Sequence, residues 1–133
     1  MRMQGKIGLV TAAGSGMGKA GAIRFAREGA SVSVVDINPE AVDAVVKEIK
    51  DAGGNAIGIV ADLTKDEESK RIVTETANHF EGLDFVWNHV GYPGPASIVG
   101  IEMKDFELTL DFNLRTILVT TEAALSEFRI RGG

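Results

Sequence analysis

A glycine-rich segment near the N-terminus constrains the fold of this chain more than any other feature. It runs Thr-Ala-Ala-Gly-Ser-Gly-Met-Gly over residues 11–18, between an apolar, strand-like run at 6–11 and a helix-like run from Met17 onward. A turn of this kind brings backbone N–H groups and the positive end of a helix dipole to one place. Glycines let a ligand approach that backbone closely. The segment therefore predicts a phosphate-binding turn between a strand and a helix.

Short apolar runs alternate with helical periodicity along the rest of the chain. Further strands are predicted at 31–36, 55–61 and 83–89. Helices are predicted over 17–28, from the Asn38-Pro39 start to Gly53, from a capping box at Thr64–Glu67 onward, and over 103–129. Strands that alternate with helices imply right-handed βαβ crossovers, so the sequence predicts an α/β fold with a parallel sheet.

Composition narrows the class of protein further. The 133 residues have the length of one domain, with no apolar run long enough for a transmembrane helix and no signal-peptide core. Cysteine is absent, which excludes disulfides and is compatible with a reducing cytoplasm. The net charge of −5, without a basic cluster, argues against a nucleic-acid partner. The two histidines lack metal-ligand spacing, so no metal site is predicted.

A carboxylate at the end of the second predicted strand suggests what the turn binds. Asp36 stands where it can accept hydrogen bonds from the ribose hydroxyls of an adenosine. Ile37, which follows it, and Ser15 in the turn are uncharged, so neither neutralises a 2′-phosphate. This pattern favours NAD over NADP. The alternative is a solvated aspartate at a strand end.

These motifs together resemble the N-terminal half of a short-chain dehydrogenase/reductase. The family turn is TGxxxGxG, and Thr11, Gly16 and Gly18 stand at its fixed positions. Ala12 replaces the first glycine, and an alanine methyl is tolerated there only where φ is negative. The resemblance implies a Rossmann-type doubly wound parallel sheet, here incomplete, with strand order 3-2-1-4 and the 83–89 strand at an open edge.

The resemblance also implies a cofactor site. Asp36 corresponds to the NAD-selecting acid, and Asp62-Leu63 to the pair that meets the adenine ring, although polarity at a helix entry is the alternative explanation for Asp62. The residues expected to bind the cofactor are Thr11, Gly14, Ser15, Gly16, Met17, Gly18, Asp36, Ile37, Asp62, Leu63, Asn88, Val90 and Gly91.

The segment after the fourth strand departs in part from the family pattern. Asn88-His89-Val90-Gly91 corresponds to Asn-Asn-Ala-Gly, with Asn88 and Gly91 matching. We expect Asn88 to bridge neighbouring strand ends, and the residues after it to lie under the cofactor. A histidine can titrate near neutral pH, but we interpret His89 as a polar substitute that holds the loop rather than as a catalytic group.

Asn113 is the predicted catalytic residue. It falls on the apolar stripe expected for the 103–129 helix, which comprises Phe106, Leu110, Leu114, Ile117, Leu118, Thr121, Leu125 and Phe128. A buried amide must be hydrogen-bonded, so a satisfied core asparagine is one explanation. The resemblance supports another, because Asp111-Phe112-Asn113-Leu114 matches the segment whose asparagine supports a catalytic water and a proton relay.

The family's chemistry also needs a serine and a Tyr-x-x-x-Lys, and the Tyr-x-x-x-Lys motif is missing here, since Tyr92 is the only tyrosine and position 96 is alanine. We therefore expect residues 1–133 to be the NAD-binding Rossmann part of a longer dehydrogenase, inactive alone. The parent would exchange a hydride with a small alcohol or carbonyl substrate, which 92–98 could partly enclose. The resemblance implies a homo-oligomer through 103–129. The alternatives are a non-catalytic dinucleotide-binding module and a methyltransferase that uses S-adenosylmethionine.

Overall fold

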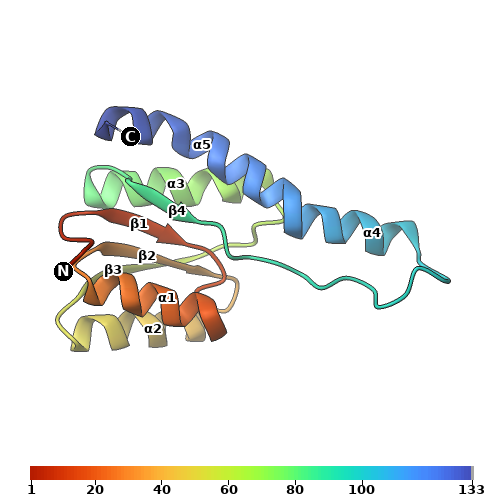
Figure 1. Cartoon of the computed structure of the whole chain (residues 1–133), viewed down its shortest axis with the longest axis horizontal. Helices are drawn as coiled ribbons and strands as arrows, with labels where there is room; N and C mark the ends of the chain where they lie inside the picture. The colour runs from red at the N-terminus through yellow and green to blue at the C-terminus, as the bar shows by residue number, and fades with distance from the viewer. Residues whose placement is uncertain (133) are drawn as a thin grey trace.

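Four strands form one parallel sheet in the computed structural model, which describes residues 1–132 (Figure 1). They are β1 (Ile7–Val10), β2 (Ser31–Asp36), β3 (Asn55–Val60) and β4 (Phe85–Trp87). Their order is β3-β2-β1-β4, which confirms the predicted fold class and strand order. β4 lies at one edge of this sheet, as expected.

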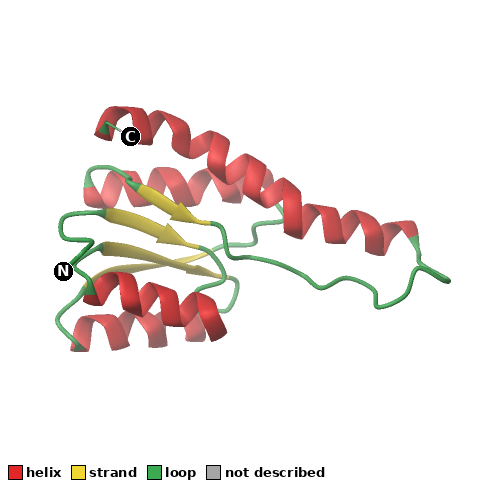
Figure 2. Ribbon diagram, viewed as in Figure 1, coloured by secondary structure: helices red, strands yellow, loops and turns green. Residues whose placement is uncertain are grey.

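Helices cover both faces of the sheet. Helices α1 (Gly16–Arg27) and α2 (Pro39–Asp51) lie on one face, and α3 (Asp66–Phe80) and α5 (Thr116–Arg131) on the other (Figure 1). Helix α4 (Met103–Leu110) and the loop before it project beyond the carboxyl ends of the strands (Figure 2). In the described part of the chain, no helix is long and apolar enough to span a membrane.

The core consists of one apolar layer on each side of the sheet. Val34 and Val35 show the division, because both are fully buried, Val34 against α1 and α2 and Val35 in the layer beneath α3 and α5. Successive strand residues point to opposite faces, so a strand buried on both sides needs a continuous apolar run. β2, with the sequence Ser-Val-Ser-Val-Val-Asp, comes close to this with three β-branched valines and the small Ser33 buried among them, and its bounds match the predicted 31–36.

The predicted capping box does not form. Helix α2 begins as expected, with Asn38 accepting a hydrogen bond from the N–H of Ala41 at 2.9 Å. Helix α3 instead has Lys65 at its N-cap position, without a side-chain cap. The Thr64 hydroxyl is diverted, because it donates to Asp62 Oδ1 at 2.6 Å. Because α3 begins one residue later than the box requires, Thr64 precedes the N-cap position and its hydroxyl is bonded to the charged Asp62 carboxylate.

The predicted helix over 103–129 is interrupted. A π-helical segment, η1 (Asp111–Arg115), separates α4 from α5. Much of the predicted apolar stripe is not buried within the described residues, because Leu114 is 54% and Leu118 62% exposed. The helix packs through Thr116, Thr120 and Ala124 instead. These smaller side chains allow close approach to the rest of the molecule, and no element within residues 1–132 buries the larger leucines.

Candidate cofactor site

Thr11 joins the ends of two neighbouring strands. Its fully buried side chain accepts hydrogen bonds from the N–H groups of His89 at 2.8 Å and Val90 at 3.0 Å. The N–H of Thr11 also donates to Trp87 O at 3.1 Å. These contacts fix the chain after β4 against the glycine turn after β1.

Asn88 does not make the bridge expected of it. Its amide donates to Thr121 Oγ1 on α5 at 3.1 Å. The reason is strand alternation, since Trp87 packs on the α1 side and the residues on either side of it point to the α5 side. Thr11 takes the bridging role, and Asn88 fastens the long helix to the end of β4.

The glycine turn has an unusual backbone at Ala12, which stands where the family pattern has its first glycine. Ala12 has φ +49°, in the left-handed region, so the negative φ needed for an unstrained alanine is not adopted. Gly18 packs tightly, because a Cβ there would lie 2.0 Å from Ala12 O. Gly16, with φ +52°, faces open space and begins α1. A helix N-terminus with unpaired N–H groups and open space above it suits an anion such as a phosphate.

Asp36 lies beside this turn. Its Oδ2 accepts a hydrogen bond from Gly14 N at 2.9 Å, and its Oδ1 accepts one from Asn38 N at 3.2 Å. Gly14 also has no room for a side chain, since a Cβ would lie 2.9 Å from the carboxylate. Each carboxylate oxygen has two lone pairs, so the held Asp36 can still accept further hydrogen bonds.

A slot of about 140 Å³ opens at the carboxyl ends of the strands. It brings together five of the predicted cofactor residues, which are Asp36, Ile37, Asp62, Leu63 and Val90. The remaining lining residues are Ala12, Ala61 and Phe112. Phe112 was missed in the sequence as a lining residue, although it stands next to Asn113 in the motif that identified the asparagine. The slot is mostly apolar with acids at its rim, which suits a flat, partly polar ring.

Asp62 is held rigidly at this slot. The Thr64 hydroxyl donates to its Oδ1 at 2.6 Å and the Thr64 N–H at 3.1 Å. These hydrogen bonds, with Lys65 nearby, lower the pKa of the Asp62 carboxyl against the opposing effect of burial. Asp62 is therefore an ionised hydrogen-bond acceptor at neutral pH.

Asn113 lies on η1 and is exposed, so its predicted burial is wrong. Its amide is nevertheless fully engaged. Oδ1 accepts a hydrogen bond from Tyr92 N at 3.0 Å, while Nδ2 donates to Tyr92 O at 2.7 Å and Thr109 O at 2.9 Å. A π-helical turn disrupts the ordinary α-helical hydrogen-bond ladder, and Asn113 satisfies one carbonyl there. The residue thus anchors the loop after β4 to the helix.

The other predicted contacts lie around the turn and the loop. Ser15 is the N-cap of α1 and Met17 is 72% exposed, so both are open to a ligand. A Cβ on Gly91 would lie 3.2 Å from Asn113 Oδ1. The His89 ring packs 4.8 Å from the Trp87 ring. These residues stay predictions as binding contacts, and the loop-holding interpretation of His89 stays one as well.

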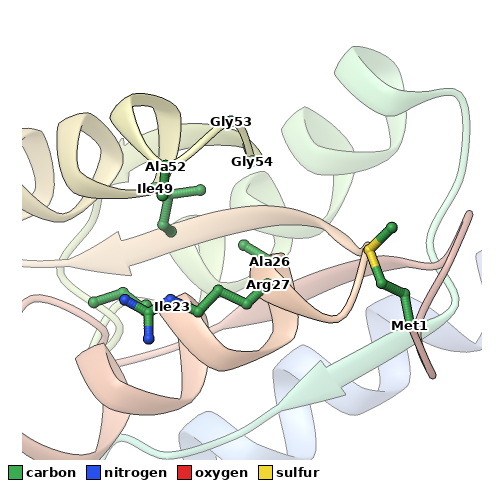
Figure 3. Close-up of a pocket in the computed structure, with 8 residues that line it drawn as sticks. All are labelled: Met1, Ile23, Ala26, Arg27, Ile49, Ala52, Gly53 and Gly54. Carbon is green, nitrogen blue, oxygen red and sulfur yellow. The ribbon is translucent and has the colours of Figure 1, made fainter.

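A second hollow lies near the amino ends of the strands, at the other end of the sheet from the slot (Figure 3). It encloses about 190 Å³ between the C-terminal ends of α1 and α2, and its lining residues are Met1, Ile23, Ala26, Arg27, Ile49, Ala52, Gly53 and Gly54. Although larger than the slot, it contains none of the predicted cofactor residues. Among residues 1–132, no cluster of three or more metal-binding side chains is present.

The fold and site define a Rossmann-type nucleotide-binding domain of the α/β class. The glycine turn, the acid that ends β2 and the slot beside β3 all lie at the carboxyl edge of one parallel sheet, where such domains bind their ligands. Residues 6–133 match the short chain dehydrogenase family, and the chain belongs to that family.

Relatives with known structures or names support this assignment. An uncharacterized oxidoreductase of Thermotoga maritima is 36% identical over 133 residues, all of this chain and 52% of the relative. The 7alpha-hydroxysteroid dehydrogenase of Escherichia coli K12 is 33% identical, again over all of this chain and 52% of the relative. A solved 7alpha-hydroxysteroid dehydrogenase, complexed with NADH and 7-oxo glycochenodeoxycholic acid, superposes with a TM-score of 0.96 at 33% identity, covering 99% of this chain and 51% of that one. The chain spans about half the length of the curated relatives it matches.

Proposed function

We propose that this chain is the NAD-binding part of an oxidoreductase that transfers a hydride between NAD and an alcohol or carbonyl group of a small molecule. The observation that carries the proposal is Asp36, held by Gly14 N–H at the rim of the slot. From there the carboxylate can accept hydrogen bonds from both ribose hydroxyls of an adenosine whose base enters the slot. Family membership supports the same chemistry, and it removes the support for the methyltransferase alternative.

Charge around the slot supports NAD over NADP. A 2′-phosphate in this place would meet the Asp36 carboxylate rather than a cation. Ile37, the next residue, is apolar and 66% exposed, and Ser15 is neutral. The NADH complex of the related hydroxysteroid dehydrogenase is consistent with this preference.

The bound nicotinamide would supply or accept the hydride. The chain's own residues would hold this cofactor: the N-terminus of α1 would bind the diphosphate, Asp36 would bind the ribose, and Asp62 with Leu63 would contact the adenine. Asn113 holds Tyr92 by both its main-chain groups, so it orders the loop that we propose to border the substrate. We also assign Asn113 the support of a water in proton transfer, as its family motif implies.

The proton-transfer groups themselves are proposed to lie in the rest of a longer protein. Residues 1–133 contain one tyrosine, Tyr92, and position 96 is Ala96 rather than lysine. General acid–base assistance contributes about 10²- to 10⁴-fold to such reactions, so the 133-residue chain alone should not turn over NAD. The lack of cysteine is compatible with that longer protein working in the reducing cytoplasm.

We also propose that the protein is a homo-oligomer that assembles through α4 and α5. The exposed apolar side chains along α4, η1 and α5 support this, among them Phe106, Leu114, Leu118 and Leu125. Large exposed apolar surfaces mark interaction sites in soluble proteins. Sedimentation of the full-length protein, with and without Leu118→Glu, tests this assembly.

Calorimetric titration of the 133-residue chain with NADH tests the proposed cofactor. Saturable binding of NADH, without a comparable response to S-adenosylmethionine, is expected. A full-length protein that binds NADH but shows no NAD-linked turnover with any of a panel of alcohols and ketones would favour the non-catalytic binding module.

A further inference from the structure

We propose that Arg115 and Asp66 form a strut that positions both the slot and the loop held by Asn113. Arg115 ends η1, and Asp66 is the first residue of α3. Arg115 Nε donates to Asp66 Oδ1 at 2.8 Å, and Nη2 donates to Oδ2 at 2.6 Å. Two parallel hydrogen bonds fix orientation as well as distance between the groups they join. The strut therefore sets how η1 sits relative to the start of α3.

The Asp66 end of the strut is continuous in sequence with Asp62 and Leu63, the part of the slot that we propose to bind adenine. Asp62 and Leu63, which line the slot, come just before α3 in the sequence. Thr64 ties back to Asp62 through two hydrogen bonds. The buried Ser69 hydroxyl on α3 donates to Leu63 O at 3.2 Å. The segment from Asp62 to Asp66 is thus fastened to α3 and moves with it.

The other end is continuous with the groups that order the loop. Phe112 in η1 lines the same slot as Leu63, so the distance between η1 and α3 determines the width of the slot. Asn113, the next residue, holds Tyr92 N–H and C=O. Because η1 has only five residues, a shift of Arg115 displaces Phe112 and Asn113 with it.

The exposure of the pair argues for a positioning role over a stabilising one. The side chain of Arg115 is 56% exposed and that of Asp66 32%, and exposed ion pairs contribute little to the free energy of unfolding. The Arg115 hydrogen bonds lower the pKa of the Asp66 carboxyl, which keeps the pair ionised at neutral pH. The far end of α5 has its own tie to the sheet, through Arg131 and Asp84, so loss of the strut leaves the helix attached.

Arg115→Gln and Asp66→Asn test the strut with two measurements. The first is the hydrogen-exchange rate of the Tyr92 amide by NMR, which requires no ligand. The second is the affinity for ADP-ribose by calorimetry. Both variants should exchange the Tyr92 amide about three- to fivefold faster and bind ADP-ribose about three- to fivefold more weakly, with little change in Tm. The charge-swapped double variant, Asp66→Arg with Arg115→Asp, should recover most of both.

Lys47→Gln is the matched control, since it breaks the exposed pair of Lys47 with Asp51 on α2, away from the slot. It should change neither measurement. The slot's part in the proposal rests on the proposed nucleotide function, whereas the exchange measurement does not. A wild-type chain that fails to bind ADP-ribose would contradict the proposed function. The hydrogen-exchange rate of the Tyr92 amide alone would then test the positioning role of the strut. An unchanged Tyr92 rate, or an unchanged affinity in a chain that binds, would overturn it.

Discussion

Asp84, just before β4, forms a hydrogen-bonded ion pair with Arg131, at the end of α5. Arg131 Nη2 lies 2.9 Å from Asp84 Oδ2, which also accepts the Ile7 N–H of β1 at 2.8 Å. The Asp84 side chain is only 8% exposed. One carboxylate thus joins β1, β4 and α5 at the amino edge of the sheet, far from the slot.

This pair makes stability depend on pH in a specific direction. Burial alone would raise the pKa of Asp84, but the hydrogen bonds from Arg131 and Ile7 and the charge of Lys6 hold it below its ordinary value. A lowered pKa means that the folded state favours the carboxylate. The stabilisation is therefore present above the ordinary pKa of aspartate and is lost as the pH falls through the folded-state pKa.

Asp84→Asn should lower the free energy of unfolding at pH 7 by about 1.5–3 kcal/mol, because hydrogen bonds to a charged group are lost. Urea unfolding at pH 7 and near pH 3 measures this, and the difference from wild type should shrink at the lower pH. Asp51→Asn, in the exposed pair with Lys47, should change stability little at either pH. Equal effects of the two variants at pH 7 would refute the role of Asp84.

Ala12→Gly should stabilise the chain. Ala12 has φ +49°, and a left-handed backbone costs a non-glycine residue about 1–2 kcal/mol. Glycine adds about 0.5–1 kcal/mol of backbone entropy to the unfolded chain, so a net gain of about 0.5–1 kcal/mol is expected. Thermal unfolding measures it. Ala13→Gly serves as the control, since residue 13 is outside the left-handed region, and should destabilise. A loss of stability in Ala12→Gly would show that the turn is unstrained.

Thr11→Val should destabilise the chain by about 1–3 kcal/mol, whereas Thr11→Ser should cost much less. Valine keeps the volume but leaves the part-buried N–H groups of His89 and Val90 without their acceptor. Serine retains the hydroxyl. Urea unfolding compares the two variants, and similar losses in both would mean that packing of the methyl group, not the hydrogen bonds, is what matters.

Local patterns predicted most of this fold because they report burial directly. The β-branched valines of β2 and the Asn38-Pro39 start of α2 each determine an element without help from distant residues. The failures all depend on competition between distant or alternative partners. The Thr64 hydroxyl donates to Asp62 and does not cap α3, and the buried face of α5 consists of Thr116, Thr120 and Ala124, not of the stripe with Leu118.

In the candidate site, too, local patterns predicted some residues, and contacts between distant segments determined the rest. Asp36, Asp62 and Leu63 were predictable because Asp36 ends β2 and the other two follow β3, and the carboxyl ends of parallel strands share an edge. Phe112 lines the slot from η1, a π-helical segment that no local pattern in the sequence predicted. Thr11, and not Asn88, bridges the neighbouring strand ends, and Asn88 bonds α5 instead. This too depends on which face of β4 meets α5.

Asp36→Ala should weaken NADH binding by about 10- to 150-fold, since a hydrogen bond to a charged group contributes about 1.5–3 kcal/mol. NADPH binding should weaken much less, because the carboxylate repels a 2′-phosphate. Asp43→Ala, on the exposed side of α2, provides a control that also removes one negative charge. An equal loss of affinity for NADH and NADPH would mean that Asp36 supports the structure of the turn and does not recognise the ribose.

The central claim is that the slot beside Asp36 binds the adenosine end of NAD. Parallel calorimetric titrations of the unmodified chain with NADH and with NADPH test it most directly. We predict saturable NADH binding at one site per chain and NADPH binding at least about tenfold weaker, the equivalent of about 1.4 kcal/mol. Equal or tighter binding of NADPH, or no binding of either cofactor, would contradict the claim.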